Sequence, residues 1–352
     1  MLMLRRGRVV SVRSGGDGRV VSFEVALEDA AETRVALAYP RLTGPVEPGD
    51  EVVVNVEAQE LGLGSGGFDL LHANLTRGLA GGGPPGAHVM KLNYTSLQHA
   101  VEPVEEGMEQ VPASIASAVA VLAVHGQLAP AAFAFAQRAP GLRAGYVQTE
   151  GGALPGDLSN DVAELVERGL LAGHTTVAPC FGARESITVE GALTAGVSEL
   201  EWDAALIGPG PGILGSASAL GHGGIAALHN AHSALAVGAD VIVAPRLSSG
   251  DERARHRGLS HHTRTVLTLL LRPVTVAAPD GIAAGVRVEL EDAVAAGGHT
   301  LADTPVAGLL EAYHDSGLPV TTMGRSLDQD LDFFRAALAA GAVLAQRTEG
   351  RE

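Results

Sequence analysis

The fold is decided by residues 118–152, which read AVAVLAVHGQLAPAAFAFAQRAPGLRAGYVQTEGG. The stretch begins with a continuous apolar run over residues 118–124, typical of a strand that is buried on both faces. Residues 128–138 then predict a helix, and residues 142–147 predict the next strand. A strand, a helix and a second strand in this order indicate a βαβ unit and a parallel sheet.

The same alternation continues along the rest of the chain. Further helices are predicted over residues 158–170, 190–200, 224–237, 259–271, 305–316 and 327–340, and further strands over residues 175–178, 204–207, 241–244, 274–277 and 320–322. No fixed-period repeat is present, which argues against a solenoid. Residues 114–352 are therefore predicted to form a doubly wound, mostly parallel αβα domain of the Rossmann-like type.

Residues 1–80 have a different pattern. Short β-branched runs occupy residues 8–12, 20–25, 33–37, 51–56 and 68–75, and a hairpin turn is predicted at Gly15–Gly18. Five short strands predict a small β-barrel of the OB or SH3 type. Few aromatic or basic residues are available for stacking or phosphate contact, so we expect a structural, substrate-covering or dimer-forming role. Residues 81–113 are predicted to be a linker and lead-in segment.

Composition and charge exclude several classes of protein. Gly and Pro supply 46 and 18 of the 352 residues, too few for collagen or low-complexity disorder, and Cys180 is the only cysteine. The chain has 24 Lys and Arg against 40 Asp and Glu, so nucleic acid is not the expected partner. No apolar run is long enough to span a bilayer, and the start of the chain does not resemble a signal peptide. A cytoplasmic protein is expected, with a homodimer as the commonest assembly.

Polar and glycine residues collect after the predicted strands. In an open parallel sheet, ligands bind beyond the carboxyl ends of the strands, so these residues are the candidates for a site. They are His125, the run Thr149-Glu150-Gly151-Gly152, the run Gly208-Pro209-Gly210-Pro211-Gly212, the segment from Arg246 to His262, and Arg325.

One run, Gly210–Gly215, matches the GxGxxG pattern of dinucleotide-binding loops. That pattern requires a helix to start at once and an acidic residue at the end of the next strand, whereas the glycine-rich stretch runs on to Gly224 and Arg246 follows the next strand. Pro211 also removes one backbone donor. The run therefore favours a generic anion-holding loop over a nicotinamide cofactor.

The histidine-rich segment offers a second candidate. Ser260 is predicted to cap a helix that begins at His261, and the positive helix start would keep His261 and His262 neutral. Neutral imidazoles can act as general bases or metal ligands, and His256 could join them on a divalent metal. The alternative is a set of exposed polar residues on a capping turn. His222, His229 and His232 are predicted on one face of the preceding helix, where a solvated face is the default interpretation.

Several of these strings together resemble a bacterial family of uncharacterised proteins, catalogued as domain of unknown function 3866. The resemblance is carried by LGLGSGG at 61–67, HVMKL at 88–92, residues 149–155 and 208–215, RHRGLSHH at 255–262 and TMGR at 322–325. It covers essentially the whole chain. The family brings no assigned activity or catalytic residues, so the resemblance implies a full-length bacterial protein and no specific function.

The leading hypothesis is a small-molecule enzyme, of hydrolase or transferase type, that acts on an anionic substrate. Proton transfer is assigned to His125, Glu150, His261 and His262. Backbone donors are assigned to Gly208, Gly210, Gly212 and Gly215. Substrate contacts are assigned to Lys91 (the only lysine), Thr149, Gly151, Gly152, His256, Arg257, Ser260 and Arg325. The alternatives are a non-catalytic metabolite sensor or assembly protein, and an NAD(P)-dependent oxidoreductase.

Overall fold

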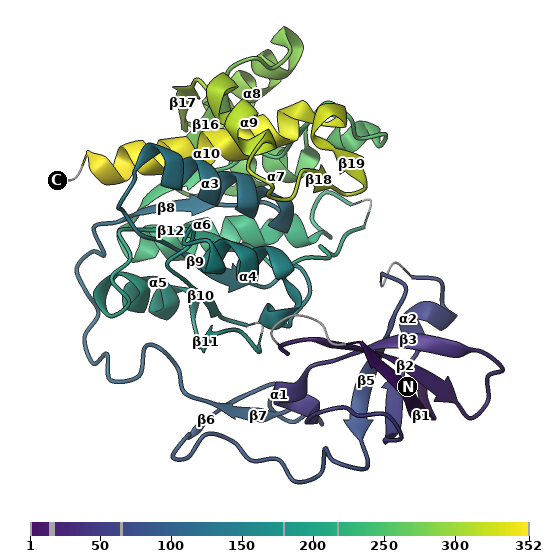
Figure 1. The fold of residues 1–352 in the computed structure, drawn as a ribbon. Helices are drawn as coiled ribbons and strands as arrows, with labels where there is room; N and C mark the ends of the chain where they lie inside the picture. Colours follow the sequence, from purple (N-terminus) through teal and green to yellow (C-terminus); the bar gives the residue numbers. More distant parts are fainter. Residues whose placement is uncertain (1, 14–17, 64–65, 179, 217, 351–352) are drawn as a thin grey trace. The chain divides into compact units, whose positions relative to one another are not determined.

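The computed structural model describes residues 2–13, 18–63, 66–178, 180–216 and 218–350 (Figure 1). Most of the predicted turn at Gly15–Gly18 lies outside these residues. The chain divides into two compact units, Met1–Glu102 and Pro103–Glu352. Each unit has hydrophobic core clusters of its own. The division falls within residues 81–113, the segment for which the sequence predicts a linker.

The first unit contains a closed barrel with the strand order β1-β2-β3-β5-β4. Its strands are β1 (Leu4–Arg13), β2 (Val21–Leu27), β3 (Thr33–Ala38), β4 (Glu51–Asn55) and β5 (Asp69–Asn74). β3 and β5 run parallel while the other pairs are antiparallel, which is a Greek-key arrangement of the OB type. Apolar side chains fill the interior, among them Phe23, Val25 and Val54. The prediction of a small five-stranded barrel is confirmed.

Asp50 is a buried carboxylate that fastens the start of β4 to the end of β5. It accepts hydrogen bonds from Asn74 Nδ2 at 2.8 Å, from the Glu47 N–H at 2.9 Å and from Arg77 Nε at 2.8 Å. Burial raises the pKa of Asp50, but these hydrogen bonds and the Arg77 charge outweigh burial and hold the pKa below its ordinary value. The ionised carboxylate therefore stabilises the barrel. Two short helices, α1 (Pro40–Thr43) and α2 (Glu57–Glu60), and the hairpin of β6 (Val89–Lys91) with β7 (His99–Val101) complete this unit.

The second unit is built on an eight-stranded sheet with the order β11-β10-β9-β12-β8-β13-β16-β17. Every neighbouring pair in this sheet is parallel. The strands are β8 (Ala118–Val121), β9 (Ala144–Thr149), β10 (Gly173–Thr176), β11 (Arg184–Glu185), β12 (Ala204–Pro209), β13 (Asp240–Val243), β16 (Thr275–Pro279) and β17 (Thr300–Thr304). From β8 the chain first adds β9, β10 and β11 on one side of the sheet. It then returns through β12 and adds β13, β16 and β17 on the other side of β8, so the sheet is doubly wound as predicted.

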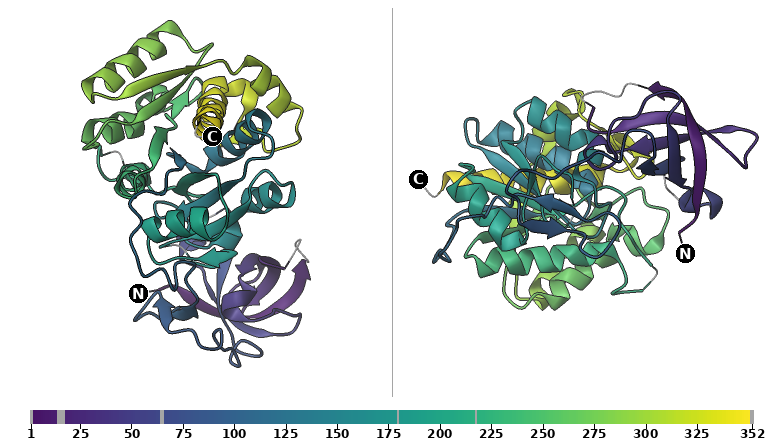
Figure 2. Two further views of the ribbon diagram at one scale, coloured as in Figure 1. Left: turned by 90° about the vertical axis from the view of Figure 1, so that its left-hand side faces the viewer. Right: turned by 90° about the horizontal axis from the view of Figure 1, so that it is seen from below.

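Helices cover both faces of this sheet (Figures 1 and 2). The central strand β8 shows why, because Ala120 belongs to one core cluster and Val119 and Val121 belong to the other. The first cluster takes side chains from α3 (Leu128–Arg138), α4 (Asn160–Glu167), α9 (Ala307–His314) and α10 (Leu331–Glu349). The second takes them from α5 (Val189–Ser198), α6 (Ala226–Ala236), α7 (His261–Leu269) and α8 (Ala284–Ala296).

Two close approaches within the second unit depend on residue size. Gly341 of α10 faces α3 so closely that a Cβ there would lie 2.0 Å from the Ala131 carbonyl oxygen. Trp202, the single tryptophan of the chain, is buried against Gly145 of β9 and Gly196 of α5. These glycines let α10 and the indole approach the neighbouring backbone.

Two sequence predictions for the second unit were wrong in detail, and one pair of elements was missed. Residues 320–322 do not add a strand to the large sheet; β18 (Thr321–Thr322) forms a two-stranded hairpin with β19 (Arg325–Ser326). The helix predicted from residue 224 begins at Ala226, so His222 precedes it and does not share a helical face with His229 and His232. The pair α8 and β17 was not predicted, because α8 buries only Leu290 and Val294 and has a narrow apolar stripe.

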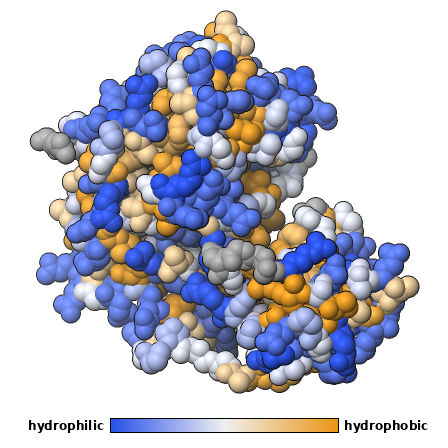
Figure 3. Space-filling view, in the orientation of Figure 1, coloured by the Kyte–Doolittle hydropathy of each residue, from blue (hydrophilic) through white to orange (hydrophobic). Residues whose placement is uncertain are grey.

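The face shown in Figure 3 mixes hydrophilic side chains with small apolar patches over the second unit. This pattern agrees with apolar residues being collected in the two core layers beside the sheet. Among the described residues, no helix combines the length and the apolar character needed to cross a membrane.

Candidate active site

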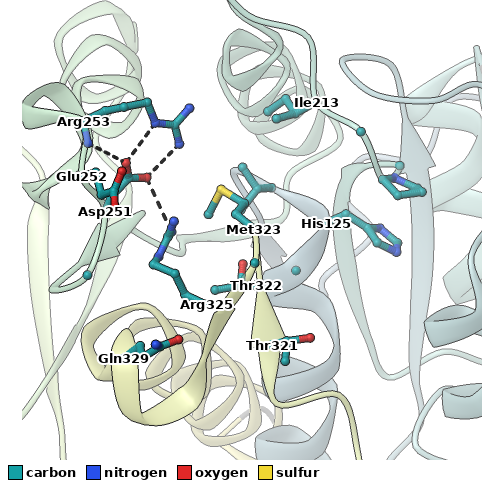
Figure 4. Close-up of a pocket in the computed structure, with 17 residues that line it drawn as sticks. His125, Ile213, Asp251, Glu252, Arg253, Thr321, Thr322, Met323, Arg325 and Gln329 are labelled. Atoms are coloured by element: carbon teal, nitrogen blue, oxygen red, sulfur yellow. Dashed lines mark hydrogen bonds and ion pairs between the residues drawn. The ribbon is translucent and has the colours of Figure 1, made fainter. Parts of the chain in front are cut away.

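A cavity of about 1140 Å³ lies within the second unit, at the carboxyl edge of the parallel sheet (Figure 4). Its volume suits a metabolite-sized ligand. Four segments line it, and three of them follow strands β8, β12 and β13, as expected for this fold. The lining comprises Val124–Gly126, Gly210–Ile213, Gly250–Arg253, Thr321–Arg325 and Gln329.

One wall of the cavity carries a network of arginines and carboxylates. Arg253 forms a two-pronged ion pair with Asp251, with distances of 2.9 Å from Nε to Oδ1 and 2.8 Å from Nη2 to Oδ2. Arg325 Nη2 lies 3.5 Å from the same Asp251 (Figure 4). Burial raises the pKa of Asp251, but the Arg253 hydrogen bonds and the charges of Arg253 and Arg325 hold it far below its ordinary value. Asp251 is therefore ionised and holds Arg253 and Arg325 in place.

Asp330 ties this wall to the hairpin. Its carboxylate is fully buried and accepts hydrogen bonds from Ser248 Oγ at 2.8 Å, from the Ser249 N–H at 2.9 Å and from Arg325 Nε at 2.8 Å. The loop after β13 and the β18–β19 hairpin are thus held by one side chain. Because Arg325 also contacts Asp251, the positions of the loop after β13 and of the β18–β19 hairpin in the cavity lining both depend on Asp330.

Arg246 connects the cavity to a group of histidines. Its guanidinium is buried, with Nη1 3.1 Å from His262 Nδ1, Nη2 3.2 Å from Met323 Sδ and Nη2 3.6 Å from Asp251 Oδ2. Burial, with the positive charge of Arg253, lowers the pKa of Arg246 to about 10. Arg246 therefore remains charged at neutral pH.

Met323 lies at the tip of the hairpin, where the backbone turns in two residues. Met323 has φ +47° and Gly324 has φ +79°, which is the conformation of a tight hairpin turn that favours Asn and Gly. A methionine in this region is strained, and such strain is concentrated at functional sites. The turn places the Met323 thioether in the cavity lining and against Arg246.

The histidine cluster consists of His222, His256, His261 and His262. The ring centroids are 3.9 Å apart for His222 and His262, 4.5 Å for His261 and His262, and 4.8 Å for His256 and His261. Ser260 caps α7 as predicted, because its Oγ accepts the His262 N–H at 3.3 Å, and it also bonds His256 Nδ1 at 2.8 Å. The cluster therefore gathers His256, His261 and His262 of the RHRGLSHH string and adds His222, which was predicted to lie on a helix.

The imidazoles of this cluster are neutral at physiological pH. Burial, followed by the charge of Arg246, lowers the pKa of His262 to about 2 and that of His256 to about 3. Burial also lowers the pKa of His222 and of His261. The expectation of neutral histidines holds, but its main cause is burial beside an arginine, not the helix start.

His125 lies across the cavity from the arginine wall and has a defined tautomer (Figure 4). Its Nδ1 is 3.2 Å from the Pro209 carbonyl oxygen, which can only accept, so Nδ1 carries the proton. Its Nε2 then accepts the hydroxyl proton of Ser159, whose Oγ is 2.7 Å away. Burial lowers the pKa of His125, so the ring is a neutral base. Ser159 was not predicted, since its only sequence signal is that of a helix cap, the role it also has at α4.

The other predicted residues are distributed over several places. Gly210, Gly212 and Arg325 line the cavity with His125. Arg257 donates to the Asp251 backbone carbonyl at 3.2 Å, behind the arginine wall. Lys91 is in β6 of the first unit.

Thr149, the last residue of β9, and the three residues after it lie outside the cavity lining. Thr149 accepts a hydrogen bond from Asn230 at 2.9 Å, and the Glu150 side chain is 60% exposed, 3.4 Å from His229 Nδ1. Gly151 and Gly152 pack against the backbones of neighbouring loops, and a Cβ on Gly152 would lie 2.2 Å from the Gly210 oxygen. Glu150 and these two glycines are not part of the cavity lining.

The GxGxxG run does not form a dinucleotide-binding turn. Gly208 accepts the Tyr146 hydroxyl through its carbonyl, and Gly215 forms an isolated bridge with His222. Helix α6 begins only at Ala226, so its start is separated from the glycine run by a further loop. Gly210–Ile213 line the cavity instead. Cys180 is buried, in agreement with the small buried thiol that the sequence favours.

Comparison with known families identifies the chain. Residues 35–341 match the family described as protein of unknown function (DUF3866), which confirms the resemblance found in the sequence. No curated protein matches the chain.

Proposed function

We propose that this chain, which belongs to the family described as protein of unknown function (DUF3866), is a hydrolase or transferase acting on a small anionic substrate. The observation that carries the proposal is His125, a neutral imidazole of defined tautomer in the wall of a large cavity, across from paired arginines. A base and a set of cationic groups facing one cavity are the elements that such chemistry requires.

The base in this proposal is His125. The Nδ1–H bond to the Pro209 carbonyl orients the ring and directs the Nε2 lone pair at the Ser159 hydroxyl. Ser159 donates its hydroxyl proton to Nε2, so the hydroxyl can pass on a proton that it accepts from a substrate or water. His125 is a better candidate than Glu150, which is 60% exposed and does not line the cavity.

The anion-binding groups in this proposal are Arg253 and Arg325. A guanidinium has five N–H donors in a planar fork, and the ion pair with Asp251 engages only the Nε and Nη2 atoms of Arg253. The Arg253 side chain is 47% exposed, so it can reach a ligand. Backbone groups of Gly210 and Gly212 would contribute further contacts, as expected for an anion-holding loop.

The test combines binding with turnover. Thermal shift of the full chain with phosphate and carboxylate metabolites identifies ligands, and p-nitrophenyl phosphate and p-nitrophenyl acetate serve as generic substrates. His125→Asn keeps an amide N–H near the position of Nδ1 but removes the base, and we expect a loss of about 10²–10⁴-fold in kcat/KM. The matched control is His314→Asn, at an exposed position of α9.

Two outcomes would count against the proposal. If no anionic compound stabilises the protein and no ester is turned over, the enzyme assignment fails. If a metabolite binds but is not converted, the protein is a sensor, the principal alternative that the sequence leaves open. A cytoplasmic bacterial homodimer belongs to the same proposal, and light scattering after size-exclusion chromatography tests the dimer.

A further inference from the structure

Three histidines at one edge of the second unit bring their ring nitrogens together. One nitrogen from each of His222, His261 and His262 lies within 4.8 Å of the other two. His222 comes from the loop before α6, while His261 and His262 form the first turn of α7. Neutral imidazole is the commonest protein ligand for transition metals. The group is chemically suited to a metal, and the orientation of its atoms decides whether it is also arranged for one.

Hydrogen bonds fix which nitrogen of His222 can bind. Nε2 lies 2.9 Å from the Ala219 carbonyl oxygen and must donate, so Nδ1 carries the lone pair. At metal sites, the ring nitrogen of a histidine that does not bind the metal usually donates its N–H to a carbonyl or carboxylate oxygen. His222 is 6% exposed, and its Nδ1 is buried with no hydrogen-bond partner among the described residues. His261 Nε2 is likewise buried with no hydrogen-bond partner among the described residues.

Gly224 keeps the space between these rings open. A Cβ on Gly224 would lie 2.6 Å from His262 Nδ1 and 3.0 Å from His222 Nδ1. The two Nδ1 atoms therefore lie beside the same small volume next to the Gly224 backbone. Because any side chain would fill this volume, glycine is the residue that allows both lone pairs to reach one ligand.

We infer that His222, His261 and His262 form a binding site for one divalent transition metal of the zinc type. Imidazole nitrogens favour Zn²⁺ and Co²⁺ over Mg²⁺ or Ca²⁺, which require oxygen ligands. Zn–N bonds of about 2.0–2.1 Å place tetrahedral nitrogens about 3.3 Å apart, so the rings close by about 1.5 Å at most. The parallel stack of His222 on His262 opens as they turn toward the ion.

Metal binding at this site acts on Arg246. His262 Nδ1, which faces the shared volume, accepts a hydrogen bond from Arg246 Nη1 at 3.1 Å. A metal on that nitrogen displaces the guanidinium, and the carboxylate of Asp251, 3.6 Å from Nη2, is the nearby partner for the released charge. The ion would therefore free a cationic group beside the cavity wall. This inference does not depend on the proposed reaction.

The test is metal binding by the full-length protein after treatment with a chelator. We expect one Co²⁺ per chain, with a visible absorption band that Zn²⁺ abolishes and Mg²⁺ leaves unchanged. His261→Ala should weaken Co²⁺ binding at least 100-fold, and Gly224→Ala should do the same by filling the shared volume. His314→Ala, an exposed histidine on α9, should bind as the parent does.

Two results would overturn the inference: no Co²⁺ binding tighter than millimolar by the parent protein, or equal binding by the parent and His261→Ala. Because His261 is half-buried at a helix start, its substitution is expected to leave the fold intact. Trp202 fluorescence checks the fold of each variant, since Trp202 is buried in the same unit.

Discussion

Asp330→Asn is expected to destabilise the second unit strongly and to disorder the cavity wall. The Asp330 carboxylate accepts a hydrogen bond from Ser248 Oγ, another from the Ser249 N–H and a charge-assisted one from Arg325 Nε. The asparagine side chain keeps one acceptor oxygen, but its NH₂ group replaces the other and faces hydrogen-bond donors, with which it cannot bond. Breaking a buried ion pair by removing one charge costs about 3–5 kcal/mol, and Arg325, whose side chain is only 17% exposed, keeps only its longer contact with Asp251 at 3.5 Å.

The assay is unfolding followed by the fluorescence of Trp202, which reports on the second unit alone because the chain has a single tryptophan. For a unit of this size, 1 kcal/mol shifts the melting temperature by about 2–4 °C, so Asp330→Asn should lower it by roughly 6–20 °C. The matched control is Asp328→Asn, an exposed aspartate two residues away, which should leave it within about 2 °C.

A loss below about 1 kcal/mol for Asp330→Asn would refute this reasoning, because it would mean that the buried pair contributes no more than a surface ion pair. Ser248→Ala provides a graded comparison. It removes one neutral donor to the carboxylate and the acceptor of the Asp251 N–H, and we expect a smaller cost of about 1–3 kcal/mol.

Two further predictions concern stability. The pKa of Asp50 in the folded protein lies below its unfolded value. The carboxylate therefore stabilises the fold above an unfolded pKa of about 3.9, and this stabilisation is lost as pH falls through the folded pKa. Hydrogen exchange of β4 peptides should show this acid-dependent opening, and Asp50→Asn should remove the pH dependence. Gly341→Ala should cost about 1–3 kcal/mol by overpacking α10 against the Ala131 carbonyl, measured by denaturant unfolding, whereas Gly308→Ala, at a helical position with open space around it, should be neutral or stabilising.

The architecture could be predicted from the sequence because the two units have different periodicities. The continuous apolar run from Ala118 predicts a central strand, and the helix predicted at residues 128–138 matches α3 at both ends. The position of the site then follows from topology, since parallel strands direct their following loops to one edge. Of the residues selected in this way, His125 and Gly210 line one cavity; Arg325 lines it too, but from the β18–β19 hairpin and not from a strand of the large sheet.

The residues that organise the site could not be predicted in the same way. Asp330 and Ser248 are 82 residues apart, and an aspartate near a helix start is ordinarily expected at the surface. Ser159 gives only the signal of a helix cap, and nothing in the sequence pairs it with His125. His222 is predicted to share a helical face with His229 and His232, whereas it precedes a 3-10 turn at Gly223–Ile225 and the helix begins only at Ala226.

The hairpin that closes the cavity has a consequence for the order in which the protein matures. Residues 321–325 and Gln329 line the cavity, and Asp330 leads directly into α10, which packs against α3 near the beginning of the unit. A chain growing on the ribosome can pair the central strands long before these residues emerge. The cavity is therefore among the last parts to form, so a nascent chain that lacks α10 has an unfinished ligand site however much of its sheet is already assembled.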